Sequence, residues 1–273
     1  MNEIQDNKNQ IVPAASHDTS GEKVPGKSVS FRTFWEKAVP ILLALLIWQA
    51  ASMLVSSSIL LSSPLDVLLR LGTIWREEGF FRILLFTISH IAGGYLLALC
   101  SGILLAFLAA RFSVIEMLLW PWVTCFRSVP VASMVVIFLI WVSSRNLSVL
   151  ISFLVVFPVI YNNVLTGLKN VDRRMLELAQ VFRLPAGRKL RYIVLPQIRP
   201  YLVSAASVTA GMAWKAGVAA EIIGTPPLSV GKMIYQSKIW LDTDDLFAWT
   251  LILVVLSVLF EKLFTALLKK LIP

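Results

Sequence analysis

The stretch ILLFTISHIAGGYLLALCSGILLAFLAA (residues 83–110) contains no charged side chain. An α-helix needs about 20 predominantly apolar residues to cross the hydrocarbon core of a membrane. This stretch is longer than that, so a helix built from it can tilt within the bilayer or project beyond it. It therefore predicts a transmembrane helix, and the fold class depends on how many such stretches the chain contains.

The composition of the whole chain is that of a membrane protein. Of its 273 residues, 57% are hydrophobic and 15% are charged, and the mean hydropathy is +0.77. Soluble domains carry about 25% charged residues. The net charge of +9 would suit a nucleic-acid-binding protein, but basic cytoplasmic loops account for it in a membrane protein. We therefore expect membrane lipid, and no nucleic acid, around this chain.

We predict an all-α integral membrane protein with six transmembrane helices. The predicted spans are residues 39–61, 83–110, 117–144, 146–168, 201–220 and 246–268. The polar residues 1–35 lack an apolar block and predict a disordered tail. The transmembrane domain is therefore expected to occupy residues 36–273.

The distribution of basic residues predicts the orientation. With both termini in the cytoplasm, the inner segments hold 17 of the 25 Lys and Arg residues, and the outer loops hold six. Arg127 and Lys215 lie within spans. Because cytoplasmic loops are enriched in Lys and Arg, this orientation is favoured over its reverse. We therefore place both termini and the basic segment 172–190 in the cytoplasm.

The segment ELAQVFRLPAGRKLRYIVLP (residues 177–196) interrupts the apolar blocks with charge and helix-forming residues. Asn170 or Asp172 can cap a helix that runs to about Arg183. Pro185 then breaks it, and a second helical piece can follow. The first helix would carry an apolar stripe of Leu176, Ala179 and Phe182. The alternative is a solvated loop whose charges only follow the orientation rule.

This segment resembles the EAA signature of ABC importer permeases, which reads E-A-A, three residues, Gly, nine residues, I-x-L-P. Leu178 replaces the second residue of the signature, and Arg183 stands where the family has Gly, with Pro185 and Gly187 nearby to supply a bend. The resemblance implies a coupling helix, within 172–190, that docks on a separate ATP-hydrolysing subunit. The coupling residues that it implies are Glu177, Leu178, Ala179, Phe182, Arg183, Leu184, Gly187, Ile193, Leu195 and Pro196.

Other stretches resemble permeases of the nitrate, sulfonate, taurine and bicarbonate group. FRSVPVASMVVIFLIWV (126–142) is similar to the Arg-Pro-x-Pro-Pro stretch that opens a core helix of that group. AWKAGVAAEIIGTPPLSVGKMI (213–234) resembles its fifth helix and the following loop, and residues 85–111 its long second helix. The resemblance covers roughly residues 60 to 270 and implies the type I ABC importer permease fold.

Charged side chains inside a membrane are costly and are candidates for function. Arg127, close to the helix-breaking Pro130, could line the passage and meet an anionic solute, or could bond a carbonyl group or Glu221. Lys215 has the same two interpretations, and Glu221 could pair with either cation or belong to a gate. The candidate pathway residues are Arg127, Ser128, Pro130, Lys215 and Glu221.

We therefore predict the membrane-spanning subunit of an ATP-driven ABC importer for a small solute, with anions among the candidate classes. GTPPLSVGKM lacks the spacing of an ATP-binding loop, so we expect no catalytic residue, metal or cofactor in this chain. The resemblance implies two ATP-binding subunits that carry ATP and Mg, an extracytoplasmic solute-binding protein and a second permease copy, as a homodimer in the bacterial cytoplasmic membrane. The alternative is an ion-coupled secondary transporter, but the inverted repeats and midplane carboxylates typical of one are not evident.

Overall fold

The computed structural model describes residues 31–55 and 60–271 of the chain. The chain divides into two units, residues 1–46 and 47–273. Helix α1 (Phe31–Val55) begins in the first unit and contains Pro40. Most of the predicted tail lies outside the described residues, but its last five residues belong to α1. The first predicted span, 39–61, coincides with α1 as far as Val55.

The described part of the second unit is built from helices joined by short turns, with no strand. After α1 the helices are α2 (Pro64–Ile74), α3 (Phe80–Arg111), α4 (Ser113–Ser128), α5 (Val131–Phe138), α6 (Ser144–Lys169), α7 (Arg173–Val181), α8 (Ala186–Lys189), the π-helix η1 (Leu190–Val194), α9 (Leu195–Gly224), α10 (Val230–Trp240) and α11 (Thr243–Leu271).

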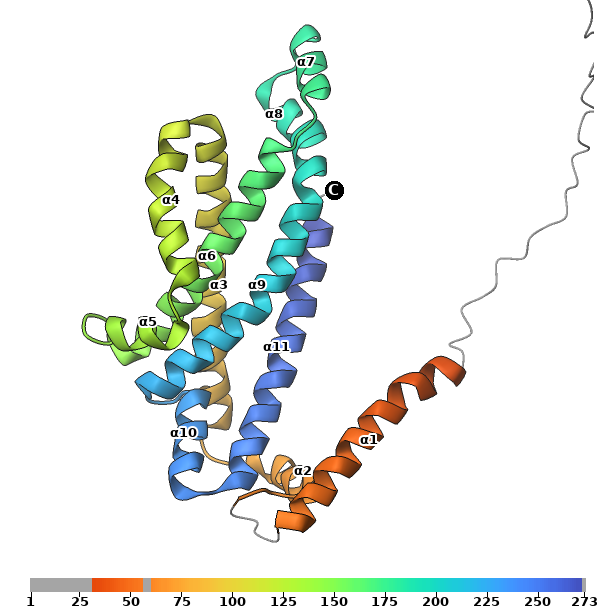
Figure 1. The fold of residues 1–273 in the computed structure, drawn as a ribbon, viewed down its shortest axis with the longest axis vertical. Helices are drawn as coiled ribbons and strands as arrows, with labels where there is room; N and C mark the ends of the chain where they lie inside the picture. The colour runs from red at the N-terminus through yellow and green to blue at the C-terminus, as the bar shows by residue number, and fades with distance from the viewer. Residues whose placement is uncertain (1–30, 56–59, 272–273) are drawn as a thin grey trace, which may run out of the picture. The chain divides into compact units, whose positions relative to one another are not determined.

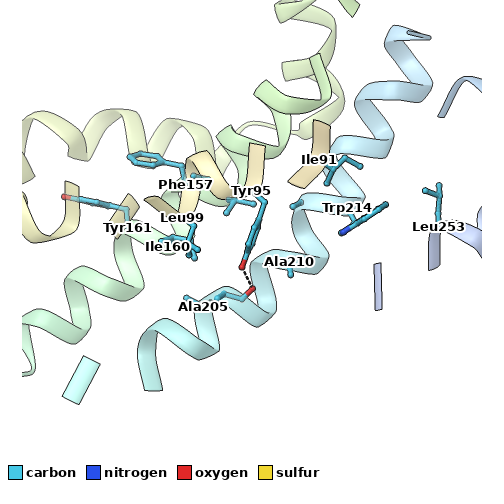
Figure 2. Packing of buried hydrophobic residues seen from close by; sticks show 14 of the residues in the cluster. Ile91, Tyr95, Leu99, Phe157, Ile160, Tyr161, Ala205, Ala210, Trp214 and Leu253 are labelled. Atoms are coloured by element: carbon cyan, nitrogen blue, oxygen red, sulfur yellow. Dashed lines mark hydrogen bonds between the residues drawn. The ribbon is translucent and has the colours of Figure 1, made fainter. Parts of the chain in front are cut away.

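Helices α3, α6 and α9 form the centre of this unit (Figure 1). α6 packs along both α3 and α9, and α11 packs against α9. Tyr95 and Ile160 are fully buried between the central helices, and Trp214 is nearly so (Figure 2). The hydroxyl of Tyr95 donates a hydrogen bond to the carbonyl oxygen of Ala206 over 2.9 Å. This bond ties α3 to α9 where water is excluded.

The contact between α3 and α6 requires small residues. A Cβ atom added to Gly94 would lie 2.3 Å from the carbonyl oxygen of Val149. Helices in a membrane associate through close packing, because the lipid supplies no hydrophobic driving force between them. Gly94 therefore allows the backbones of α3 and α6 to approach, whereas the neighbouring Gly93 meets no atom within 4 Å.

Three of the described helices, α3, α6 and α11, are both long and apolar enough to span a membrane. α4 and α5 together would make a fourth span if they are taken as one bent span. α9 contains the predicted span 201–220 and is 30 residues long, but it is not among the helices that are apolar enough to span a membrane. Length and composition of the described helices therefore do not reproduce the predicted count of six.

The stretch 117–144, predicted as one span, is broken into α4 and α5, which are bent by 107°. Val129 has an extended backbone, as expected for a residue before proline, and Pro130 precedes the first residue of α5. Proline has no N–H group with which to continue the hydrogen bonding of α4. α5 therefore turns aside and packs against α6 and α9.

Two groups of short helices lie at opposite ends of the central helices (Figure 1). α7 and α8 lie at one end, and α2 and α10 at the other. At the latter end Arg70 of α2 forms salt bridges with Asp245 of α11 and with Glu77. The hydrogen bond to Asp245 raises the pKa of Arg70 above its already high ordinary value. Arg70 therefore holds α2 to α11 as a permanent cation.

Candidate functional site

The segment between α6 and α9 forms two short helices that meet at a sharp turn. The side chain of Asp172 accepts a hydrogen bond from the N–H of Arg174 over 2.8 Å and caps α7. Pro185 precedes α8, which begins at Ala186 and continues through η1 into α9. The predicted cap, the break and the second helical piece are confirmed.

Arg183 has a left-handed backbone conformation, with φ of 49°. The N–H of Leu184 donates to the carbonyl of Ala179 over 2.9 Å, and the N–H of Arg183 donates to the carbonyl of Gln180 over 3.0 Å. This pair of bonds is the Schellman motif that ends many helices, normally with glycine in the left-handed position. The turn therefore has the geometry that favours glycine, although arginine occupies it at a cost of about 1–2 kcal/mol.

The exposed surface of α7 includes an apolar stripe. Met175, Leu178, Val181 and Phe182 are 50%, 55%, 79% and 69% exposed. Ala179, in contrast, is 3% exposed, so it does not share that surface. Of the predicted apolar stripe, Phe182 belongs to this exposed surface, whereas Leu176 is half-buried and Ala179 is buried. A spacing of three and four residues from Met175 could have revealed the outer stripe in the sequence.

The other predicted coupling residues follow the turn of the chain. Glu177, Arg183, Leu184 and Gly187 are exposed, whereas Ile193 and Leu195 are half-buried where η1 passes into α9. Pro196 is exposed at the second residue of α9, where the helical backbone continues from η1 and Pro196 has no N–H to donate. The side chain of Gln197 accepts a hydrogen bond from the N–H of Asp172 over 2.9 Å. This bond joins the beginning of the segment to the beginning of α9.

Arg127 and its neighbours lie at the end of α4. Arg127 is exposed and forms no salt bridge among the described residues. Its position in the last turn of a helix favours a positive charge. Ser128 donates to the carbonyl of Thr124 over 2.9 Å, and Pro130 lies at the bend that follows. The side chain of Arg127 lines a cavity of about 130 Å³ between α4 and α6.

Lys215 lies at a different place, in a groove of about 450 Å³ between α9 and α11. The groove is lined mainly by apolar side chains, and Lys215 is exposed there. Neither Lys215 nor Arg127 bonds Glu221. The structure therefore does not bring the predicted pathway residues together in one site within a single copy of the chain.

Glu221 is fully buried at a joint between α3, α9 and α10. Its Oε2 accepts hydrogen bonds from the hydroxyl of Thr87 over 2.9 Å and from the N–H of Gly231 over 3.2 Å. The N–H of Val230 in turn donates to the hydroxyl of Thr87 over 3.0 Å. The alternative that Glu221 pairs with Arg127 or Lys215 is not met within this chain: Oε2 bonds groups of α3 and α10, and Oε1 has no hydrogen-bond partner among the described residues.

These features define an all-α membrane protein. A solved structure of an amino acid ABC transporter matches this chain with a TM-score of 0.56 and 16% sequence identity, covering 73% of this chain and 97% of the other. At that identity the match shows the fold. The predicted fold class is thereby confirmed, apart from the number of spans.

Residues 102–273 match the family described as binding-protein-dependent transport system inner membrane component. The chain therefore belongs to this family. The putative aliphatic sulfonates transport permease protein SsuC of Bacillus subtilis is 28% identical over 93% of each chain. The taurine transport system permease protein TauC of Escherichia coli is 26% identical, covering 83% of this chain and 84% of its own. The nitrate import permease protein NrtB of Synechococcus elongatus is 27% identical, over 68% and 69%.

Membership of this family establishes the general function. The chain is the membrane-embedded permease subunit of an ABC importer, which confirms the main prediction over an ion-coupled secondary transporter. We expect its partners to be components that bind ATP, as in other ABC importers, and components that bind the solute. The family description itself states dependence on a binding protein.

Proposed function

We propose that the segment 172–190 is the docking site for ATP-hydrolysing subunits, and that this chain converts their closure into alternating access of a solute passage. Two such subunits, carrying ATP and Mg, would dock on two copies of the permease. A solute-binding protein would deliver the solute from the other side of the membrane. The chemistry then belongs to the partners, and this chain contributes the passage and the mechanical link.

The observation that carries this proposal is the exposed apolar surface of α7. Four large apolar side chains of this nine-residue helix and its cap face outward: Met175, Leu178, Val181 and Phe182. Burial of such side chains contributes about 1.5–3 kcal/mol each. Because α7 lies beyond the ends of the central helices (Figure 1), a protein partner is a more suitable cover than the interior of the bilayer.

A mechanical link requires that the docking segment be joined firmly to the central helices. α8 runs through η1 into α9 with no intervening loop, and Gln197 bonds the N–H of Asp172. A displacement of α7 would therefore reach α9, which packs along α6, α10 and α11. This continuity supports transmission from the docking surface to the central helices.

The orientation and the solute class belong to the same proposal. The side chain of Arg199 donates to the carbonyl of Lys269 over 2.9 Å, so the end of α11 lies beside the start of α9. We place this end, the docking segment and both termini in the cytoplasm. Three of the relatives are named for sulfonates, taurine and nitrate. We therefore propose a small solute that carries an oxyanion group, with Arg127 on its passage and a homodimer as the assembly.

Co-purification with the ATP-hydrolysing subunits tests the docking site. Val181→Asp places a charge on the proposed interface, and it should abolish co-purification and solute-stimulated ATP hydrolysis while the permease still folds. Ile239→Asp is the matched control, because Ile239 is a 57% exposed apolar residue of α10 at the opposite end. Normal co-purification of Val181→Asp would refute docking on α7.

A further inference from the structure

The cavity between α4 and α6 is lined by five polar or charged side chains together with Trp120, Val123 and Leu165. α4 contributes Glu116, Thr124 and Arg127, and α6 contributes Tyr161 and Asn162. The cavity has a volume of about 130 Å³, roughly four times the volume that one molecule occupies in liquid water. It can therefore hold a small group of a few heavy atoms, but not a long solute.

Two charged side chains, Glu116 and Arg127, line this cavity. The carboxylate of Glu116 is paired with the ammonium group of Lys169 at 2.5 Å. Arg127 has no such partner among the described residues. With Glu116 and Lys169 counted together as a neutral ion pair, the guanidinium group of Arg127 is the one remaining charge on the cavity lining, and it favours a monoanion.

The hydroxyl of Tyr161 has no hydrogen-bond partner among the described residues, although the residue is only 2% exposed. Its neighbours Ile160 and Leu99 are apolar, and the hydroxyl points away from them (Figure 2). Buried polar groups nearly always have a hydrogen-bond partner, so an unpartnered hydroxyl is unusual. A polar ligand in the cavity that Tyr161 lines would supply the missing partner.

Thr124 and Asn162 extend the set of polar groups that line the cavity. No hydrogen bond of either side chain to another described residue is found. Each can donate to an acceptor, and neither carries a charge. Together with Tyr161 and Arg127 they offer donors from both helices to one acceptor-rich group.

We propose that this cavity binds a singly charged oxyanion group, such as a sulfonate or a nitrate, as a step in solute passage. Arg127 supplies the charge, and Tyr161, Asn162 and Thr124 donate hydrogen bonds to the oxygen atoms. The proposal rests on the importer function above and adds to it a site and its ligand chemistry. The rest of a larger solute would lie outside the cavity, beyond the exposed side of Arg127.

The test uses the permease assembled with its ATP-hydrolysing subunits in nanodiscs of neutral phosphatidylcholine. Thermal unfolding is followed while potassium methanesulfonate or potassium nitrate replaces potassium chloride at constant ionic strength. The wild-type complex should be stabilised in a saturable way. Tyr161→Phe should weaken the apparent affinity about tenfold, since a hydrogen bond to a charged group is lost. Arg127→Gln should weaken it further.

Two variants serve as matched controls. Tyr235→Phe removes a hydroxyl from α10, and Arg111→Gln removes a charge at the end of α3, and neither residue lines the cavity. Both should keep the wild-type response. Tyr161→Phe without anion should unfold at the wild-type temperature or above it, because the variant no longer buries an unpartnered hydroxyl. An unchanged anion response in Tyr161→Phe and Arg127→Gln would overturn the proposal.

Two further outcomes distinguish a solute site from a lipid site and separate the cavity from the docking surface. If stabilisation that depends on Arg127 and Tyr161 arises only from phosphatidylglycerol in the nanodisc, the cavity holds a lipid headgroup and the solute site is refuted. If the anion response is unaltered in both variants while the Val181→Asp complex fails to assemble, the cavity proposal fails and the docking proposal stands. If instead both variants lose the anion response while the Val181→Asp complex assembles normally, the cavity proposal stands and the docking proposal is refuted.

Discussion

The hydroxyl of Thr87 donates a hydrogen bond to Oε2 of Glu221 over 2.9 Å and accepts one from the N–H of Val230 over 3.0 Å. One small side chain of α3 thereby joins the end of α9 to the start of α10. All three groups are buried, so no water is available to replace a lost partner. These bonds therefore hold the end of α9 that lies away from the docking segment 172–190.

Replacement of Thr87 by valine should destabilise the permease by about 2–4 kcal/mol, because it removes one donor to Glu221 and leaves the N–H of Val230 unpaired. Thr87→Ser keeps the hydroxyl and should cost about 1 kcal/mol, the usual loss for one buried methyl group. Unfolding of the purified protein in detergent measures both. Equal losses for the two variants would mean that the hydroxyl does not hold the joint.

Arg183→Gly should stabilise the turn between α7 and α8 by about 1 kcal/mol, because glycine adopts the left-handed conformation without steric cost. Hydrogen exchange at the amide of Leu184, which closes the turn, should slow about fivefold, as that free energy implies. Arg188→Gly is the control and should have the opposite effect. Arg188 lies within α8, and glycine destabilises a helix by about 1 kcal/mol. Faster exchange in Arg183→Gly would contradict the geometry of the turn.

Phe182→Ala should weaken binding of the ATP-hydrolysing subunits by about 2 kcal/mol or more, as truncation of a central aromatic anchor does at protein interfaces. Its effect on unfolding of the isolated permease should stay within about 0.5 kcal/mol, because Phe182 is 69% exposed. Phe81→Ala offers a comparison, with a 71% exposed phenylalanine in the first turn of α3. Equal binding by both variants would exclude Phe182 from the interface.

Gly94→Ala should destabilise the chain by about 1–3 kcal/mol or prevent its folding, because the added methyl group collides with the carbonyl of Val149 and forces α3 and α6 apart. Gly93→Ala, one residue earlier, meets open space and should be neutral or stabilising by up to about 1 kcal/mol. Thermal unfolding of the two variants side by side is the measurement. Equal unfolding temperatures for the two variants would show that α3 and α6 can move apart without loss of stability.

Local features of the docking segment were predictable because short-range rules govern them. A capping aspartate, a proline and the spacing of Glu177 to Pro196 were enough to predict two short helices and their likeness to a coupling segment. The left-handed backbone of Arg183 was not predictable from propensity, since arginine rarely adopts it. Only the glycine that the family has at this position indicated a left-handed conformation. The hydrogen bond from the N–H of Leu184 to the carbonyl of Ala179 accounts for that conformation in the structure.

The candidate passage was less predictable, because it depends on which helices pack together. Arg127, Lys215 and Glu221 were grouped by their charge within apolar stretches, but the structure places them at three separate locations. Tyr161 carried no signal in the sequence, as an aromatic residue in an apolar helix normally belongs to the core. Its significance depends on α4 lying against α6, which brings Arg127 to the same cavity.

The amino-acid sequence by itself determined that this chain is an α-helical membrane protein and where its basic, helix-breaking segment falls, since both follow from hydropathy and local stereochemistry. Tertiary structure decided where the stretch 117–144 breaks and turns aside, which face of α7 is left uncovered, and that Glu221 is held by Thr87 and Gly231 rather than by a cation. The reason is that a buried polar group is stabilised by whichever partner packing brings within hydrogen-bonding distance, and residues 87, 221 and 231 meet only when α3, α9 and α10 are assembled.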